Sequence, residues 1–386
     1  MTRVQQTWFA GLFLALIYSV PLVQSAVEAA GGRAPQFLDV FERTPTRQNL
    51  RSYEKQMEDE SLVARAVRPW VQYSQFVLLG DAGEKVLLGR NGWLFYKPDV
   101  RYLVEPHSSE AVRAILDFRD QLAARGIHLM VMPTPGKPSI YGDRLTPRLD
   151  HGPVDSPTRA MISRLRAAGV EVFDLFELFA GRGDSAPPLY LLRDTHWSAD
   201  AASMAAGRIA ARLKALGWTS SGSRAYEVRS VRVRRASDIL KMTQAPLIEA
   251  LFPAEEVWCR QVVETASGRP YRDEAAAEVL VIGDSFLRMY QTDEPRAAGF
   301  IAHLAYNLQQ PVASLVNDGG ASTLVRQEMA RRPQLLRGKK VVVWEFVERD
   351  IRFGLEGWKI VPLTAEPRST DNRTAAMATP GPSRNP

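Results

Sequence analysis

The feature that most constrains this chain is an alternation of amphipathic helical segments with short apolar runs between residues 109 and 346. The runs 127–133 (IHLMVMP) and 341–346 (VVVWEF) are almost wholly apolar, as expected of strands that are buried on both faces. Strands that alternate with helices form a parallel sheet covered by helices. In such sheets the ligand site lies beyond the carboxyl ends of the strands, so the residues that follow each strand are the first candidates for function.

We therefore expect an α/β domain whose parallel sheet has helices on both faces. The Asn-Gly turn at 91–92, followed by the aromatic run 93–96, predicts a further strand upstream. The run 228–235 (VRSVRVRR) alternates apolar and basic residues, as an edge strand protected by charge does; a track for a polyanion is the alternative. The expected helices cover 109–125, 156–168, 200–216, 295–308 and 321–332, and the expected strands cover 127–133, 170–175, 279–282, 312–316 and 341–346.

The two ends of the chain differ from this alternating region. Residues 8–23 carry no charge and lie close to Met1, so we expect either a cleaved signal peptide or a retained membrane anchor; a buried N-terminal helix is the alternative. Both export readings place the protein in a bacterial periplasm. The expected organisation is an export segment and linker at 1–35, a helical lead-in at 36–80, a catalytic domain at 81–361 and a disordered tail at 362–386.

Counts of a few residue types exclude several classes of protein. Cys259 is the only cysteine, so no intrachain disulfide and no cysteine-based zinc site can form. Only five histidines occur, and there is no HExxH, Walker A or GxGxxG motif. The net charge of +6, from 49 Lys+Arg and 43 Asp+Glu, permits an anionic partner but does not indicate nucleic acid. We expect no cofactor and no metal.

Two short motifs supply the residue types of a serine nucleophile and its base. Gly283-Asp284-Ser285 follows the apolar run 279–282, where a serine is well placed to meet a ligand. A serine hydroxyl needs a base, for which histidine is best suited at neutral pH. His196 comes two residues after Asp194, and in an extended segment such side chains point the same way, so the carboxylate can orient the imidazole. Each motif alone is also compatible with an ordinary turn or helix cap.

Together, the motifs GDSF, DTHWS, GRNGWLFY and VVVWEFVER resemble those of the SGNH-hydrolase-like sugar O-acetyltransferases of the AlgJ/AlgX type, over roughly residues 86–349. The resemblance implies an SGNH-hydrolase-like (flavodoxin-like) fold with Ser285 as nucleophile, His196 as general base and Asp194 as its orienting partner. Ordinary SGNH hydrolases carry the GDS block first and a DxxH block last. Here the order is reversed and the spacing is DxH. This circularly permuted motif order favours the acetyltransferases over the plain hydrolases.

Other residues near the strand ends are weaker candidates. Asn317 follows a strand and matches the asparagine that the resemblance implies for the oxyanion hole, although Asn-Asp-Gly-Gly is also strong turn chemistry. Lys137 and Tyr141 follow another strand and are candidates to contact a sugar carboxylate; a rigid proline loop is the alternative. Arg288 and Tyr290 follow the nucleophile closely and are candidates to line the substrate groove.

Three further features are expected to be structural. Glu345 and Arg349 are expected to pair at the end of the sheet. Cys259 is expected to pack as a small hydrophobic residue. The remaining histidines have no partner at a suitable spacing and are expected to be structural or exposed; they are His107, His128, His151 and His303.

Three functions remain open at this point. The first is an O-acetyltransferase in which Ser285 takes an acetyl group and passes it to a hydroxyl of an exported polysaccharide, for which an anionic, alginate-like polymer would suit the mild basic excess. The resemblance implies that a membrane-bound O-acyltransferase partner moves acetyl across the membrane. The second is a carbohydrate acetylesterase that passes acetyl to water. The third is a non-catalytic polysaccharide-binding scaffold on the same fold, against which the intact candidate residues argue.

Overall fold

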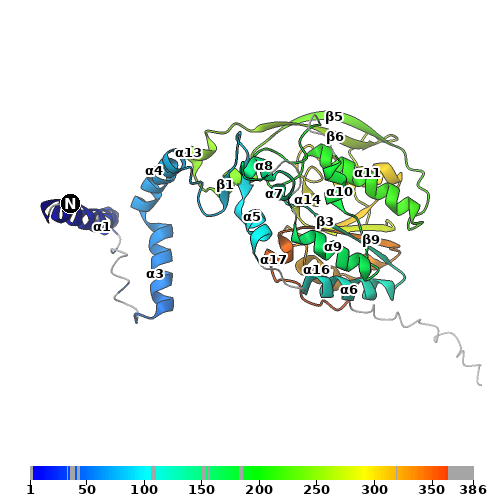
Figure 1. Ribbon diagram of the computed structural model, residues 1–386, viewed down its shortest axis with the longest axis horizontal. Helices are drawn as coiled ribbons and strands as arrows, with labels where there is room; N and C mark the ends of the chain where they lie inside the picture. Colours follow the sequence, from blue (N-terminus) through cyan, green and yellow to red (C-terminus); the bar gives the residue numbers. More distant parts are fainter. Residues whose placement is uncertain are drawn as a thin grey trace, which may run out of the picture.

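The computed structural model describes residues 3–32, 34, 40, 44–105, 110–149, 154, 156–181, 186–318 and 320–363. Most of the linker that ends at residue 35, the tail beyond residue 363, the expected start of a helix at Ser109, His107 and His151 lie outside these residues. Within them, a large α/β body carries the N-terminal helices as an arm on one side (Figure 1).

Most of the expected strands and helices are present, with small shifts at their ends. The strand expected over 170–175 covers only Glu171–Val172, and a short helix begins at Leu175. The helix expected from residue 295 begins at Phe300, because Arg296 and Ala297 have positive φ angles of 66° and 49° that no α-helix contains. The strands are β1 Val86–Leu88, β2 Leu94–Tyr96, β3 His128–Thr134, β4 Glu171–Val172, β5 Tyr226–Arg235, β6 Glu255–Glu264, β7 Val279–Gly283, β8 Ala313–Val316 and β9 Val341–Val347. The helices are α1 Arg3–Ala30, α3 Arg47–Glu60, α4 Leu62–Leu79, α5 Lys97–Val104, α6 Glu110–Ala123, α7 Lys137–Ile140, α8 Gly142–Leu145, α9 Pro157–Ala167, α10 Leu175–Ala180, α11 Ala199–Ala215, α12 Asp238–Met242, α13 Pro246–Glu249, α14 Ser285–Arg288, α15 Phe300–Leu308, α16 Leu324–Arg331 and α17 Asp350–Phe353, with a 3-10 turn at Pro333–Leu336.

The central sheet has five parallel strands in the order β4-β3-β9-β7-β8. β9, which comes last in the chain, is the central strand: Val343 pairs with Met130 of β3 on one side and with Val281 of β7 on the other. All seven residues of β9 are buried. The continuous apolar runs of the sequence therefore correspond to strands that are covered on both faces, as predicted.

The order of the strands shows the circular permutation that the motif order predicts. Counted from β7, which leads to Ser285, and with the two ends of the chain joined, the strands come in the order β7, β8, β9, β3, β4. The sheet then reads 2-1-3-4-5, which is the flavodoxin-like order. In that order the topological switch point lies between β7 and β9, and ligands bind at the carboxyl ends of these strands. The predicted fold class is confirmed.

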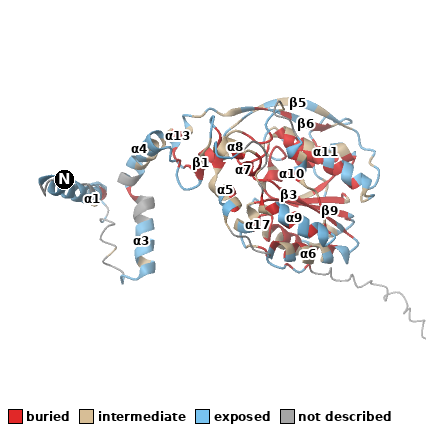
Figure 2. Ribbon diagram, viewed as in Figure 1, coloured by how far each residue is buried: buried red, intermediate tan, exposed pale blue. Residues whose placement is uncertain are grey.

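Helices cover both faces of the sheet (Figure 1). On one face α6 and α16 meet, and Phe118 packs edge-on against Trp344 with ring centroids 5.1 Å apart. On the other face α11 packs along α15. Figure 2 shows that the buried residues concentrate between these layers and the sheet. This packed body fixes the strand ends from which the site is built.

Two antiparallel strand pairs lie outside the main sheet. β1 and β2 form a hairpin across Asn91 and Gly92, whose φ angles of 53° and 78° are those that an Asn-Gly turn favours. β5 corresponds to the strand expected from VRSVRVRR, whereas its partner β6 is not among the expected strands. Between them, α12 and α13 pack on the β1–β2 hairpin in a small second core, to which Phe76 of α4 adds its ring. We call residues 226–264 the β5–β6 insert.

The N-terminal arm consists of α1, α3 and α4. Val4–Ala30 of α1 is long and apolar enough to cross a membrane, with a mean hydropathy of 1.8. Its side chains are largely exposed, which argues against the buried N-terminal helix considered as an alternative (Figure 2). The helical lead-in expected over 36–80 contains α3 and α4, joined at Ser61.

Candidate active site

Ser285 lies at the first turn beyond β7, at the switch point of the sheet. Asp284 fixes this turn, because its Oδ1 accepts from the Phe286 N–H at 2.9 Å and its Oδ2 accepts from the Val347 N–H at 3.1 Å. Residue 283 must be glycine, since a Cβ at this position would lie 2.6 Å from the Oε2 of Glu345. The GDS motif therefore places the serine at the end of the sheet and ties it to β9.

Ser285, His196 and Asp194 form a hydrogen-bonded relay. The Nε2 of His196 lies 2.9 Å from Ser285 Oγ, and its Nδ1 lies 2.6 Å from Asp194 Oδ1. Asp194 also accepts from the backbone N–H of His196 at 3.1 Å, a second bond that holds the carboxylate beside the ring. The structure thus brings together the three residues expected from the two motifs, in the arrangement of a Ser-His-Asp triad.

The loop that carries the histidine is itself held by the nucleophile turn. Residues 190 and 197 form an antiparallel bridge, and the indole N–H of Trp197 donates to the carbonyl of Phe286 at 3.1 Å. Ser198 then caps α11 by accepting from the Ala201 N–H at 3.3 Å. The sequence DTHWS therefore does two things at once: it begins a helix, and it fastens the histidine loop to the serine turn.

Neighbouring charges set the protonation of the relay. Burial alone would raise the pKa of Asp194, but His196 and Arg235, whose Nε lies 3.5 Å from Oδ2, lower it well below its usual range. Burial alone would lower the pKa of His196, whereas Asp194 and Asp238 raise it above the usual value. Asp194 is therefore ionised at neutral pH, and the imidazole is a stronger base than a free histidine.

The β5–β6 insert supplies a second carboxylate at the histidine, which the sequence analysis missed. Asp238 accepts from the N–H of Thr195 at 2.9 Å and from its hydroxyl at 2.5 Å, and its Oδ2 lies 3.5 Å from His196 Nδ1. Glu255, also from the insert, accepts from the N–H of Arg193 at 2.7 Å. The charged end of VRSVRVRR could have directed attention to this contact, because the strand ends three residues before Asp238. The insert clamps the histidine loop from outside the sheet.

Asp194, His196 and Asp238 are also the described residues with the geometry of a metal site, since one ligand atom of each lies within 4.8 Å of the others. Two observations favour a relay over a metal centre. The Nδ1 of His196 is already bonded to Asp194 at 2.6 Å, and the cationic Arg235 stands beside Asp194. A cation here would compete with a positive charge of the protein itself.

Buried carboxyl groups support the site from within the sheet. Glu345 accepts from the Thr134 hydroxyl at 2.7 Å and from the Asp284 N–H at 3.2 Å. Burial and the nearby Asp284 raise the pKa of Glu345 well above its usual range. Glu348 accepts from the Gly136 N–H at 2.9 Å and from three hydroxyl groups. These bonds join the end of β9 to both the GDS turn and the loop after β3.

The expected pairing of Glu345 with Arg349 is wrong. Glu345 lies within β9 and faces the GDS turn, whereas Arg349 lies beyond the end of the strand, beside α5. The Nη1 of Arg349 pairs with Asp99 Oδ1 at 2.9 Å, and its guanidinium lies over the ring of Phe286 at 5.9 Å from the centroid. Arg349 therefore places a positive charge beside the residue that follows the nucleophile.

Two of the weaker candidates are buried, which rules out the surface roles expected for them. Lys137 is 1% exposed, and its Nζ donates to the carbonyl oxygens of Leu94, Leu192 and Asp194 at 2.7, 2.7 and 3.2 Å. Its hydrogen bonds hold the histidine loop against β2, and its ammonium group is not free to bind a sugar carboxylate. Tyr290 is fully buried, with Arg235 over its ring at 5.4 Å, so it does not line an open groove.

The other weaker candidates remain predictions, with the following contacts. The hydroxyl of Tyr141 accepts from the Leu189 N–H at 2.8 Å. Arg288 is one-third exposed and pairs with Asp293 and, at 2.8 Å, with Asp318. The amide of Asn317 donates to Glu328 at 3.3 Å, and a shallow pocket of about 500 Å³ is lined by Asn317 and Arg288 together.

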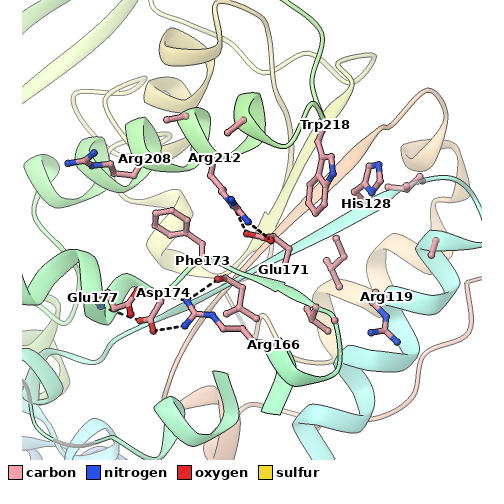
Figure 3. Close-up of a pocket in the computed structure, with 18 of the residues that line it drawn as sticks. Arg119, His128, Arg166, Glu171, Phe173, Asp174, Glu177, Arg208, Arg212 and Trp218 are labelled. Atoms are coloured by element: carbon pink, nitrogen blue, oxygen red, sulfur yellow. Dashed lines mark hydrogen bonds and ion pairs between the residues drawn. The ribbon is translucent and has the colours of Figure 1, made fainter. Parts of the chain in front are cut away.

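A groove of about 1320 Å³ lies at the free edge of the sheet, along β4, and none of the three relay residues is among its described lining (Figure 3). Arg212 crosses it to bond Glu171 at 2.8 and 2.9 Å. Trp218 stacks on His128 at 4.4 Å, which gives this histidine a structural partner. The charged side chains that line this groove pair largely with one another, and the groove lies away from the relay. His303 and Cys259 are buried, as expected of structural residues.

The 2-1-3-4-5 sheet with a serine–histidine–aspartate relay at its switch point defines an SGNH hydrolase-like domain. Comparison with known proteins refines this. The family described as "SGNH hydrolase-like domain, acetyltransferase AlgX" matches residues 86–348, and the chain belongs to this family. It is accordingly an acetyltransferase of the SGNH hydrolase-like class.

Individual relatives agree with the family. The chain is 25% identical over 296 residues to the probable alginate O-acetylase AlgJ of Pseudomonas aeruginosa, covering 71% of this chain and 72% of the relative. It is 23% identical over 366 residues to the corresponding protein of Azotobacter vinelandii, covering 90% and 89%. The O-acetyltransferase domain of Pseudomonas putida AlgJ has the same fold, with a TM-score of 0.55 and 23% identity over 69% of this chain and 92% of that one. Pseudomonas aeruginosa AlgX follows with a TM-score of 0.50 and 20% identity over 68% and 62%.

Proposed function

We propose that this protein transfers acetyl groups to hydroxyls of an exported, alginate-like polysaccharide through a Ser285 acetyl-enzyme. The relay of 2.9 and 2.6 Å through His196 is the observation that carries the proposal, because it gives the serine both a base and an orienting carboxylate. The names of the relatives, alginate O-acetylases, support the choice of polymer.

The proposed chemistry has two balanced steps. Ser285 Oγ attacks the acetyl carbonyl carbon of the donor while His196 Nε2 takes its proton; the donor's C–O bond then breaks, and the leaving oxygen takes that proton from His196. In the second step a sugar hydroxyl gives its proton to His196 and attacks the acetyl-serine, and the proton returns to Ser285 Oγ as it departs. Asp194 holds the Nδ1–H throughout and stabilises the imidazolium in each step.

The backbone N–H of Ser285 is the candidate donor for the oxyanion, with Asn317 as the proposed second donor. Asn317 adjoins the nucleophile strand, since its N–H donates to the carbonyl of Gly283 at 2.9 Å. Rotation of its amide away from Glu328 would free the donor for this role.

We further propose that α1 anchors the protein to the membrane, with the catalytic domain in the periplasm. The length and mean hydropathy of Val4–Ala30 support this. A periplasmic site has no access to cytoplasmic acetyl-CoA, so the donor has to be delivered across the membrane. A membrane-bound O-acyltransferase is the partner that this arrangement calls for, and the anchor would keep the two close together.

The test is to incubate the full chain, in detergent, with an activated acetyl ester, with and without oligomannuronate, and to analyse protein and sugar by mass spectrometry. Acetylated sugar together with an acetyl group on Ser285 is the expected result. Free acetate that no acceptor diminishes would indicate an esterase instead. Unchanged sugar acetylation by Ser285→Ala would overturn the proposal.

A further inference from the structure

Helix α4 has one packed face and one bare apolar face. On the packed side, the ring of Phe76 contacts Phe252 of the β5–β6 insert at 5.9 Å, edge to face. On the other side Val67, Trp70, Val71, Val77 and Leu78 are between 47% and 79% exposed. Counted from Val67, the other four follow at intervals of three, four, ten and eleven residues, which puts them along one stripe of a helix. We call these five residues the α4 apolar face.

The start of α4 is fixed to the end of the candidate membrane helix. Gln24 of α1 is 2% exposed, and its Oε1 accepts from the Leu62 N–H, the first of α4, at 2.8 Å. A bilayer core of about 30 Å is crossed by about 20 helical residues at about 1.5 Å each, which Val4–Val23 supplies. Gln24 then falls at the boundary between the hydrocarbon and the headgroups. The first turn of α4 therefore lies at the depth of the membrane surface.

The direction of the helices agrees with this position. Figure 1 shows α1 on the side of α3 and α4 that faces away from the catalytic body, with α3 and α4 running crosswise to it. When α1 crosses a membrane, a crosswise helix at its end lies along the surface. The α4 apolar face, with a tryptophan at its centre, has the composition of helices that lie in the interface.

The neighbouring helix adds a matching charge. Arg47, Arg51 and Lys55 of α3 recur every four residues and so lie on one side of that helix. They line a shallow pocket of about 520 Å³ together. Basic side chains beside a membrane-spanning segment are attracted to anionic lipid headgroups.

We propose that the α4 apolar face is buried in the headgroup region of a phospholipid bilayer, so that α4 lies in the membrane surface and sets the height of the active site above it. This rests on the membrane anchoring proposed above, but not on the chemistry of Ser285. Because α4 also packs on the insert that clamps the histidine loop, the bilayer and the catalytic loop are joined through one continuous structure.

The test uses spin labels on the full chain in vesicles of phosphatidylcholine and phosphatidylglycerol. Single cysteines replace Val67 or Val71 on the face. Arg65, an exposed residue two positions before Val67 and so on the opposite side of the helix, serves as the matched control. Cys259 does not interfere, because it is buried and burial raises the pKa of its thiol to about 12. Collision rates with oxygen and with an aqueous nickel chelate report the depth of each label.

Labels at positions 67 and 71 are expected to collide several-fold more with oxygen than with the nickel chelate, and the label at 65 is expected to show the reverse. Equal nickel accessibility at all three positions would overturn the proposal, as would loss of the protein from floated vesicles. If the label at position 71 is protected from the nickel chelate only after co-reconstitution with an integral membrane acyltransferase, the α4 apolar face binds a protein partner and the proposal is wrong. Acetyl-ester turnover of the same samples reports the proposed chemistry separately, and it is expected to stay within twofold of wild type.

Discussion

Replacing Lys137 by methionine tests whether a buried ammonium group holds the catalytic loop. Methionine keeps the apolar stem and removes the group that donates to the carbonyls of Leu94, Leu192 and Asp194. These three carbonyls belong to two segments, the β2 strand and the stretch 192–194 that carries the relay aspartate. Their donor therefore joins its own segment to both of them.

The expected loss follows from counting these bonds. The carbonyl of Leu192 also accepts from the Leu94 N–H at 3.1 Å and keeps that partner, so two acceptors, those of Leu94 and Asp194, lose the lysine as donor. An acceptor left unsatisfied in the interior costs about 1–3 kcal/mol, so two give about 2–6 kcal/mol, from which the relief of removing a desolvated cation has to be subtracted. We expect a net loss of about 2 kcal/mol in the free energy of unfolding. A shift of the loop by about 1 Å would also lower kcat by about a hundredfold in the protein that remains folded.

The pH dependence gives an independent readout. Burial lowers the pKa of Lys137 from 10.5 to about 7 in the folded protein. Between these values the unfolded chain binds the extra proton, so this group makes stability rise with pH from about 7 to about 10.5, at up to about 1.4 kcal/mol per pH unit. In Lys137→Met this part of the rise is absent.

The measurement is urea unfolding followed by tryptophan fluorescence at pH 7 and pH 9, together with turnover of an acetyl ester. Lys97→Met is the matched control, because the Nζ of Lys97 also donates to a carbonyl, that of Gly83 at 2.6 Å, but near the surface. The control is expected to change stability by less than about 0.5 kcal/mol. The reasoning is refuted if Lys137→Met unfolds at the wild-type urea concentration at both pH values and keeps its turnover.

Two further substitutions test the clamp and the nucleophile turn. Asp238→Asn removes a charge that raises the pKa of His196. The acid limb of the kcat/KM profile, which reports deprotonation of the imidazole, is therefore expected to move to lower pH, and kcat is expected to fall about tenfold. An acid limb at the wild-type pH would show that Asp238 does not act on the histidine. Gly283→Ala would place a methyl group 2.6 Å from Glu345 Oε2 and Leu287 Cδ1, and it is expected to cost about 2–3 kcal/mol of stability, measured by thermal or urea unfolding; a variant as stable as wild type would contradict the close packing of this turn.

Sequence patterns located the sheet and the relay because both are local signals. The central strands β7 and β9 are almost continuous apolar runs, and His196 and Asp194 are two residues apart, so neither signal requires knowledge of distant contacts. Helix ends were less well located: the helix expected from residue 295 begins at Phe300, because positive φ angles in the preceding turn are not visible as a pattern. β6 was not found because its sequence does not alternate apolar and polar residues: Trp258, between the buried Val257 and Cys259, is 64% exposed.

Lys137 shows where local reading fails. A lysine after Pro-Gly is typical of an exposed loop, and the groups that accept hydrogen bonds from its Nζ are not near it in the sequence. Its partners lie 43 to 57 residues away, and only the folded chain brings their carbonyls together. Asp238 was missed for the same reason, since it reaches His196 from 42 residues along the chain, through an insert whose second strand was not expected.

The sequence by itself determined the parallel α/β sheet, the permuted order of its motifs and the three relay residues, because periodicity and short-range spacing are properties of the chain. Only the tertiary structure decided what supports the relay: the buried lysine strut, the carboxyl layer beneath the GDS turn and the insert that adds a second carboxylate. The physical reason is that burial and long-range contacts set both the pKa and the position of a charged group. Neither can be read from its neighbours in sequence.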